Sequence, residues 1–359
     1  MTARRYPVVL VAMALAWATG ACGWWTTPID TPAAPTPGAV ETPAATATRP
    51  ESVSNVQPTT GPAPVTTGFG ILGDSISDEY RANDNRGGVC GFVTYNWMEQ
   101  LAERHGLNFG RWADWGEPRR TGFEYNWARS GAVAQDLISK GQAAGLAAQV
   151  ADGEVSDVMI WVGSNDFSYY TGTYTEIYDG RLTDSEVQAR VDEVSGAIEA
   201  AVELLQNAGP VRIVVATIPD GASVPDIQKA LPDAAGRQRV SDAVAEVNRR
   251  IAALAANRGL GLADVNAMLP AFSPRLDPQG NLLVGDQRIS FLGQGDEPHQ
   301  GRLGDSAGHL GTVVSGLVAN LMFVEPFNRT FALGLQPLSD TEILQSAGLD
   351  SPTANSCKP

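Results

Sequence analysis

DVMIWVGSND, residues 157–166, joins an unbroken apolar run to a polar turn. An apolar run of this length, without alternation, is typical of a strand that is buried on both faces of a parallel sheet. Residues 68–72 and 211–218 form comparable runs. Two longer segments, 184–207 and 234–257, carry apolar side chains at a helical period of about 3.6 residues. Strands that alternate with long helices predict a parallel sheet with helices on both faces.

Weaker patterns extend this alternation. Residues 122–128 and 259–265 are predicted as two more strands. An alanine-rich helix is expected over 132–150 and an apolar helix over 312–323. Ligands of such sheets bind beyond the carboxyl ends of the strands, so the residues that follow each strand are the candidates for a functional site.

Short polar motifs occupy those positions. They are Gly-Asp-Ser at 73–75, Ser-Gly at 130–131, Gly-Ser-Asn-Asp at 163–166 and Asp-Ser-Ala-Gly-His at 305–309. Each motif alone is typical of an ordinary turn or helix cap. The first three follow predicted strands and the fourth opens the last helix, so together they indicate one site that contains a hydroxyl, an amide and an imidazole.

These motifs resemble the SGNH, or GDSL-type, hydrolase family over about residues 68–325. The family's four blocks correspond to Ser75, Gly131, Asn165 and His309, and the phrases YNWARSGA, VATIPD and HLGTVVSGLVAN resemble its secreted bacterial members. The resemblance implies a flavodoxin-like three-layer α/β/α fold with a central, mostly five-stranded parallel sheet. It also implies an exported serine esterase that hydrolyses acyl or acetyl esters.

The resemblance assigns a role to each block. Ser75 would be the nucleophile and His309 the base that takes its proton, because a serine hydroxyl is a weak nucleophile until it is deprotonated. The oxyanion hole would consist of the backbone N–H groups of Ser75 and Gly131 and the side-chain amide of Asn165. Asp74 is interpreted as a structural hydrogen-bond acceptor.

The acid of the triad departs from the family pattern. Ser306 stands three residues before His309, where the family carries Asp, and Asp305 stands one residue further away. Asp296 and His299 have the family's spacing and form the alternative. The segment after His309 can form the closing helix and the segment after His299 cannot, so the prediction is His309 with Asp305, and Asp296 is held in reserve.

An aromatic segment suggests a substrate class. Five aromatic residues follow Asn165 within a short stretch: Phe167, Tyr169, Tyr170, Tyr174 and Tyr178. Tyrosines at the catalytic edge suit stacking on sugar rings, which suggests esters of carbohydrates with Tyr169, Tyr170 and Tyr174 as binding residues. The alternative is a loop whose aromatic side chains pack on one another.

Composition and motif content exclude several classes of ligand. The 359 residues carry a formal net charge of −15, and a chain this acidic would repel the phosphate backbone of nucleic acid. Metal-ligand spacings and phosphate-binding glycine loops are absent from the sequence, so no metal or other cofactor is expected. The expected ligand is a small-molecule, glycan or lipid ester.

The N-terminus indicates export. Residues 1–22 combine two arginines, a short apolar stretch and small residues before Cys22. Cleavage before Cys22 would leave a lipidated cysteine and a membrane tether, as in a lipoprotein of the cell surface. Cleavage after an earlier Ala-x-Ala triplet would release the protein, and an uncleaved anchor is the third alternative.

The rest of the chain divides into three parts. Residues 23–67 are rich in proline and threonine, with nine prolines and eleven threonines between 24 and 68, and are predicted as a disordered spacer. Residues 68–330 are the expected catalytic domain and 331–359 a C-terminal tail. Export favours oxidation, so Cys90 and Cys357 are expected to pair, the alternative being two free thiols.

Two other functions use the same fold. A cell-surface binding protein would bind ligand without turnover, and the displaced aspartate leaves this alternative open. An acyltransferase would use the same serine and base, so the sequence does not distinguish it from a hydrolase.

Overall fold

The computed structural model describes residues 66–82, 86, 93–169, 173–223, 225–295, 298–305 and 308–350. The predictions about the export signal, the lipidation of Cys22, the Cys90–Cys357 pair, Asp296 and Tyr170 lie outside the described residues. So does most of the predicted spacer, up to residue 65.

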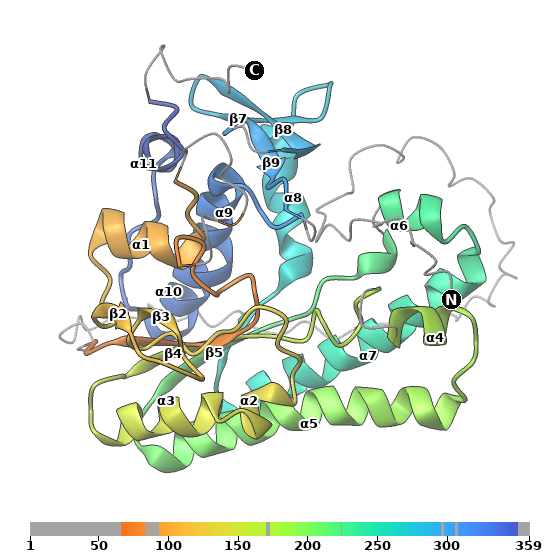
Figure 1. The fold of residues 1–359 in the computed structure, drawn as a ribbon, viewed down its shortest axis with the longest axis horizontal. Helices are drawn as coiled ribbons and strands as arrows, with labels where there is room; N and C mark the ends of the chain where they lie inside the picture. The colour runs from red at the N-terminus through yellow and green to blue at the C-terminus, as the bar shows by residue number, and fades with distance from the viewer. Residues whose placement is uncertain are drawn as a thin grey trace, which may run out of the picture. The chain divides into compact units, whose positions relative to one another are not determined.

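The central sheet has four parallel strands in the order β1-β4-β5-β6. Figure 1 labels its two middle strands, β4 and β5. Their bounds are Phe69–Gly73 for β1, Asp157–Trp161 for β4, Arg212–Ala216 for β5 and Gly261–Ala263 for β6. Every residue of β1 and β4 is buried, as their unbroken apolar sequences predict. The parallel sheet of the expected fold class is therefore present.

The prediction that residues 122–128 form a fifth strand of the central sheet is wrong. β3 (Thr121–Phe123) instead forms an antiparallel ribbon with β2 (Trp112–Asp114). The residues that follow run beside β1, where the backbone of Ile71 exchanges hydrogen bonds of 3.0 and 2.9 Å with Tyr125 and Trp127. Arg129 also donates to the carbonyl of Gly73 at 3.0 Å, but the N–H of Gly73 donates to the Gln142 side chain at 3.3 Å instead of to this segment, and the pairing remains a single bridge.

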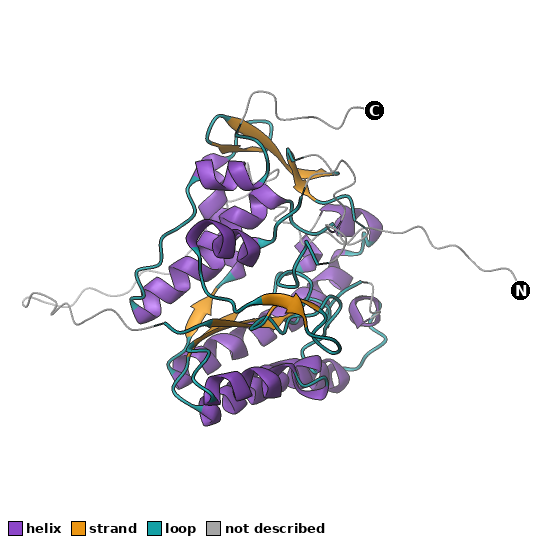
Figure 2. Ribbon diagram, turned by 60° about the vertical axis from the view of Figure 1, so that its left-hand side comes forward, coloured by secondary structure: helices purple, strands orange, loops and turns teal. Residues whose placement is uncertain are grey.

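Helices cover both faces of the sheet (Figure 2). Ile71 of β1 and Met159 of β4 belong to a core shared with α1 and α9, whereas the adjacent Leu72 and Ile160 belong to a second core shared with α3, α5 and α7. The helix bounds are Trp97–His105 (α1), Gln142–Ala151 (α3), Asp184–Ala208 (α5), Ala234–Arg258 (α7) and Thr312–Ala319 (α9). Successive residues of a strand point to opposite faces, so this division gives a three-layer α/β/α arrangement.

Along the chain, a second sheet is formed between β6 and the closing helix α9. β7 (Asn281–Val284) pairs antiparallel with β8 (Gln287–Gln294), and β8 pairs parallel with β9 (Gln300–Arg302). This sheet was not predicted from the sequence, although Gly285-Asp286 between two alternating segments is a hairpin signal. The sheet matters for the site because β9 leads directly into Asp305.

Shorter helices complete the described chain. They are α2 (Asp136–Ser139), α4 (Thr173–Tyr178), α6 (Pro225–Ala230), α8 (Met268–Phe272), α10 (Glu325–Phe331) and α11 (Asp340–Ser346), with a π-helix at Asn320–Val324. Part of the stretch predicted as a C-terminal tail is therefore folded, and Ile343 and Leu344 of α11 are buried in the core. None of the helices in the described ranges has the length and apolar character needed to cross a bilayer.

Candidate active site

Ser75 lies in the tight turn that follows β1. The carbonyl of Asp74 accepts the N–H groups of Ser77 and Asp78 at 3.1 and 3.0 Å, which closes one helical turn around Ser75. The buried Asp74 carboxylate accepts the N–H of Ile76 at 3.0 Å, as expected for a structural acceptor. Ser75 itself is partly exposed although its neighbours are buried, and its backbone N–H has no partner among the described residues. The turn thus presents a hydroxyl and a free amide at the carboxyl end of β1.

Asp305 and His309 are in direct contact. The Asp305 carboxylate accepts the backbone N–H of His309 at 3.1 Å through Oδ1 and contacts the imidazole Nδ1 through Oδ2. Burial opposes ionisation of this carboxyl, but the hydrogen bonds from His309 outweigh it and lower the pKa of Asp305. An ionised carboxylate on Nδ1 is the arrangement that orients an imidazole for general-base catalysis.

The second sheet positions this pair. Gln294, the last residue of β8, donates to the carbonyl of Asp305 at 3.0 Å. Leu303 donates to the carbonyl of His309 at 2.7 Å, and Gly308 donates to the carbonyl of Asp305 at 3.2 Å. The sequence analysis missed Gln294, because its role depends on a strand that was not predicted.

Arg86 contacts the opposite side of the imidazole. Its Nη1 lies 3.4 Å from His309 Nε2, and its Nη2 donates to Ser130 Oγ. The guanidinium lies over the ring of Tyr80, 5.2 Å from its centroid, and 3.8 Å from a carboxylate oxygen of Asp78. A guanidinium cannot accept a hydrogen bond, so Nε2 must be the acceptor and Nδ1 the nitrogen that carries the hydrogen. No sequence motif had pointed to Arg86.

The loop of Gly131 is tied to the loops of Ser75 and Asn165. Asp78, just after Ser75, accepts the N–H of Ser130 at 2.7 Å, and the Asn165 side chain donates to the carbonyl of Ala132 at 2.9 Å. Gly131 is exposed, and within the described chain its N–H has no partner. Its φ of +81° favours glycine, whereas a Cβ there would meet nothing within 4 Å. Backbone conformation, rather than crowding, therefore selects glycine at this position.

Two carboxyls belong to these loops, the buried Asp74 and the partly buried Asp166. Asp166 accepts the N–H of Ala134 at 2.9 Å, which joins the third polar motif to the second. Burial raises the pKa of both Asp74 and Asp166 to about 7, and the nearby Asp166 carboxylate adds to the effect at Asp74.

The structure brings the predicted residues together through these bonds. His309 is connected to the Ser130-Gly131 loop by Arg86, and that loop is connected to Asn165 through Ala132. Among the described residues, no hydrogen bond joins Ser75 Oγ to His309 Nε2. The nitrogen faces Arg86 instead.

His299 lies in different surroundings. Its Nε2 is 3.2 Å from Gln287 Oε1, and its carbonyl accepts the N–H of Ser290 in the second sheet. The described part of the chain places no carboxylate on this ring. Within the part of the chain that the structure describes, the carboxylate contact that a triad requires is made to His309.

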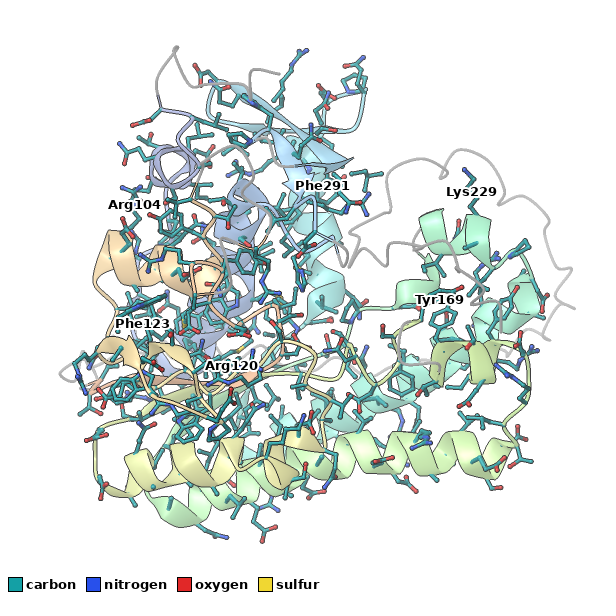
Figure 3. The ribbon with its side chains drawn as sticks, viewed as in Figure 1. Arg104, Arg120, Phe123, Tyr169, Lys229 and Phe291 are labelled. Atoms are coloured by element: carbon teal, nitrogen blue, oxygen red, sulfur yellow. The ribbon has the colours of Figure 1, made fainter. Side chains whose placement is uncertain are left out.

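The aromatic segment is largely core. Tyr174 is only 2% exposed and stacks on Tyr178 with ring centroids 6.5 Å apart. Tyr174 is therefore corrected from a substrate-binding residue to a packing residue of α4, because a buried ring has no face for a sugar. Tyr169 is partly buried and lies near α4 (Figure 3).

A family model described as GDSL-like Lipase/Acylhydrolase matches residues 69–282. The match covers more than half of the 359-residue chain. It includes Ser75, Gly131 and Asn165 and ends before Asp305 and His309. No curated protein matches the sequence.

Solved structures show limited likeness. Protein YXIM from Bacillus subtilis has a TM-score of 0.42 and 14% identity over 76% of this chain, which spans 58% of that protein's length. An extracellular lipase from Streptomyces rimosus has a TM-score of 0.36 and 20% identity over 57% of this chain and 83% of the lipase. An acetylxylan esterase from Geobacillus stearothermophilus has a TM-score of 0.38 and 15% identity over 76% of this chain and 96% of the esterase.

Proposed function

The chain belongs to the GDSL-like lipase/acylhydrolase family, and from this premise we propose that it is an exported serine esterase with a Ser75-His309-Asp305 triad. Its substrates would be acyl or acetyl esters, including esters of carbohydrates. The oxyanion hole would comprise the N–H groups of Ser75 and Gly131 and the amide of Asn165.

One observation carries the proposal: His309 has a carboxylate on Nδ1 and a guanidinium on Nε2. This arrangement selects the neutral tautomer whose Nε2 lone pair is available to take a proton. Two further observations support it, namely the backbone N–H groups of Ser75 and Gly131, which have no partner among the described residues.

The proposed reaction gives each of these groups a role. Ser75 Oγ attacks the ester carbonyl while Nε2 of His309 takes the hydroxyl proton, and Asp305 stabilises the imidazolium that forms. The carbonyl oxygen becomes an oxyanion that accepts hydrogen bonds from these N–H groups, and each donor lowers the barrier by about 3–4 kcal/mol. The alcohol leaves with the proton from Nε2, and water hydrolyses the acyl-serine by the same steps in reverse.

The direct test is hydrolysis of 4-nitrophenyl esters from acetate to long acyl chains by the full chain, with Ser75→Ala beside it. We expect turnover in the unmodified protein and a loss of about 10⁶-fold in kcat in Ser75→Ala. Turnover that survives in Ser75→Ala would overturn the serine mechanism. No turnover on any ester, with ligand bound equally well by both proteins, would favour the binding-protein alternative.

Acyl transfer to added acceptor alcohols would favour the acyltransferase alternative.

Export and tethering through Cys22 have their own test. The mass of the mature protein from a membrane fraction should equal the chain from Cys22 onward plus its lipid, and Cys22→Ser should shift the protein to the soluble fraction.

A further inference from the structure

We propose that Arg86 is a catalytic residue that stabilises the alcohol oxygen as it leaves. The inference rests on the proposed function, because it assigns His309 as the base. It concerns one side of the reaction, the departure of the alcohol, for which the triad and the oxyanion hole provide no donor other than His309 itself.

The position of Arg86 follows from the path of the proton. A leaving oxygen must lie about 2.6–3.2 Å from Nε2 of His309 to receive its proton. Arg86 Nη1 lies 3.4 Å from that same nitrogen, so an oxygen that meets Nε2 comes within reach of the guanidinium as well. Arg86 therefore touches a reacting atom and stands where the alcohol departs.

Protonation of the imidazole makes the Arg86 donor available. Nη1 donates to Nε2 only while His309 is neutral, because a protonated Nε2 has no lone pair. Once His309 has taken the proton of Ser75, two donors face each other, and the Nη1–H needs a new acceptor. The ester's alcohol oxygen, which gains negative charge as its bond to carbon breaks, is that acceptor.

The charge of Arg86 is only partly compensated. Its side chain is 6% exposed, and its carboxylate neighbour Asp78 is 3.8 Å away. Asp78 also lies 3.9 Å from Arg129 Nη1, so one carboxylate faces two guanidinium groups. The buried Nε of Arg86 has no hydrogen-bond partner in the described chain. A cation held with donors to spare stabilises developing negative charge more strongly than it would in water.

The neighbours of Arg86 hold it in this position. Nη2 donates to Ser130 Oγ, next to Gly131, and the face of the guanidinium lies on the buried ring of Tyr80. Substrate binding can thus replace the bond to Nε2 without moving the guanidinium, which is the requirement for preorganised stabilisation.

The test is the dependence of rate on the leaving group. 4-Nitrophenyl acetate releases a phenolate that needs little help, whereas ethyl acetate releases a basic alkoxide. We expect Arg86→Met to lower kcat/KM by about tenfold or less on 4-nitrophenyl acetate and by about 10²–10³-fold on ethyl acetate. Arg86→Lys should recover part of the loss on ethyl acetate, because it restores the charge.

Arg119→Met is the matched control. Arg119 is also a partly buried arginine that lies over aromatic rings, those of Trp115 and Trp127, but it contacts neither Asp78 nor His309, so any loss in this variant should be equal on the two esters. An equal loss on both esters in Arg86→Met would overturn the inference, because a structural role does not distinguish leaving groups. If Arg86→Met does not fold, Arg86→Gln takes its place, and an unchanged ester ratio in that variant would overturn the inference.

The outcomes separate this inference from the function on which it rests. Absence of turnover in the unmodified protein, or turnover that survives in Ser75→Ala, would overturn both. Turnover that depends on Ser75, with the same ester ratio in the unmodified protein and in Arg86→Met, would overturn the role of Arg86 alone.

Discussion

Asp305 contacts His309 through both carboxylate oxygens: Oδ1 accepts the backbone N–H and Oδ2 contacts Nδ1 of the ring. An amide at this position would present a donor to Nδ1 and favour the tautomer whose hydrogen is on Nε2. We expect Asp305→Asn to fold normally and to lower kcat about 10³–10⁴-fold with KM little changed. Steady-state kinetics on 4-nitrophenyl acetate would measure both constants.

Asp296→Asn is the control for that prediction, because Asp296 has the family's spacing to the other histidine. It should keep the kcat of the unmodified protein. A large loss in Asp296→Asn, with activity retained in Asp305→Asn, would move the acid of the triad to Asp296.

At the scale of single elements, the second sheet determines where the acid–base pair lies. Gln294 at the end of β8 holds the carbonyl of Asp305 at 3.0 Å. Gln294→Leu removes this bond and lets the loop shift. Misplacement of the acid and base lowers the rate of the chemical step more than the affinity for substrate. We expect kcat to fall about 10–10²-fold with KM little changed. Kinetics together with a thermal melt would separate this effect from unfolding.

Gln287→Leu is the matched control, since Gln287 lies on the same strand and contacts His299 instead. It should retain the kcat of the unmodified protein. Equal losses in the two variants would mean that the sheet acts through stability alone.

Elements that are buried on both faces could be predicted from the sequence. The run at 157–161 has no polar alternation because helices cover both of its faces, and the structure has β4 there. The segment 122–128 is also rich in apolar and aromatic residues, but the N–H of Gly73 that would extend its pairing with β1 donates to the side chain of Gln142, and the pairing remains one bridge. The fifth strand could therefore not be predicted from apolar character alone.

The same limit applies to the site. Ser75, Gly131, Asn165 and His309 follow from short motifs, since each motif carries its own turn. Arg86 does not, because the partners that give it a role come from parts of the chain far apart in sequence, such as Ser130 and His309. Its contacts could be found only from the structure.

At the scale of the whole molecule, buried carboxyls couple folding to pH. Burial raises the pKa of Asp74 and Asp166 to about 7 and that of Glu79 to about 8. In the unfolded chain these groups titrate near pH 4. Between those limits the folded protein binds more protons, so the free energy of unfolding decreases as pH rises. The stabilisation is complete below about pH 4 and is lost as pH passes 7 to 8. The net charge of −15 adds repulsion in the same direction.

Glu79→Gln tests this coupling away from the proposed triad. Glu79 accepts the N–H of Phe123 at 2.7 Å, and glutamine keeps that acceptor while removing the charge that burial disfavours. The Tm of the unmodified protein should fall between pH 5 and pH 9, and the fall should be several degrees smaller in Glu79→Gln, since 1 kcal/mol moves Tm by about 2–4 °C in domains of this size. Glu103→Gln on α1 removes the same formal charge from a more exposed side chain and is the control. If the two variants follow the unmodified protein equally across this range, the ionisation of Glu79 is not what lowers stability at high pH, and the remaining fall belongs to Asp74, Asp166 and the overall charge.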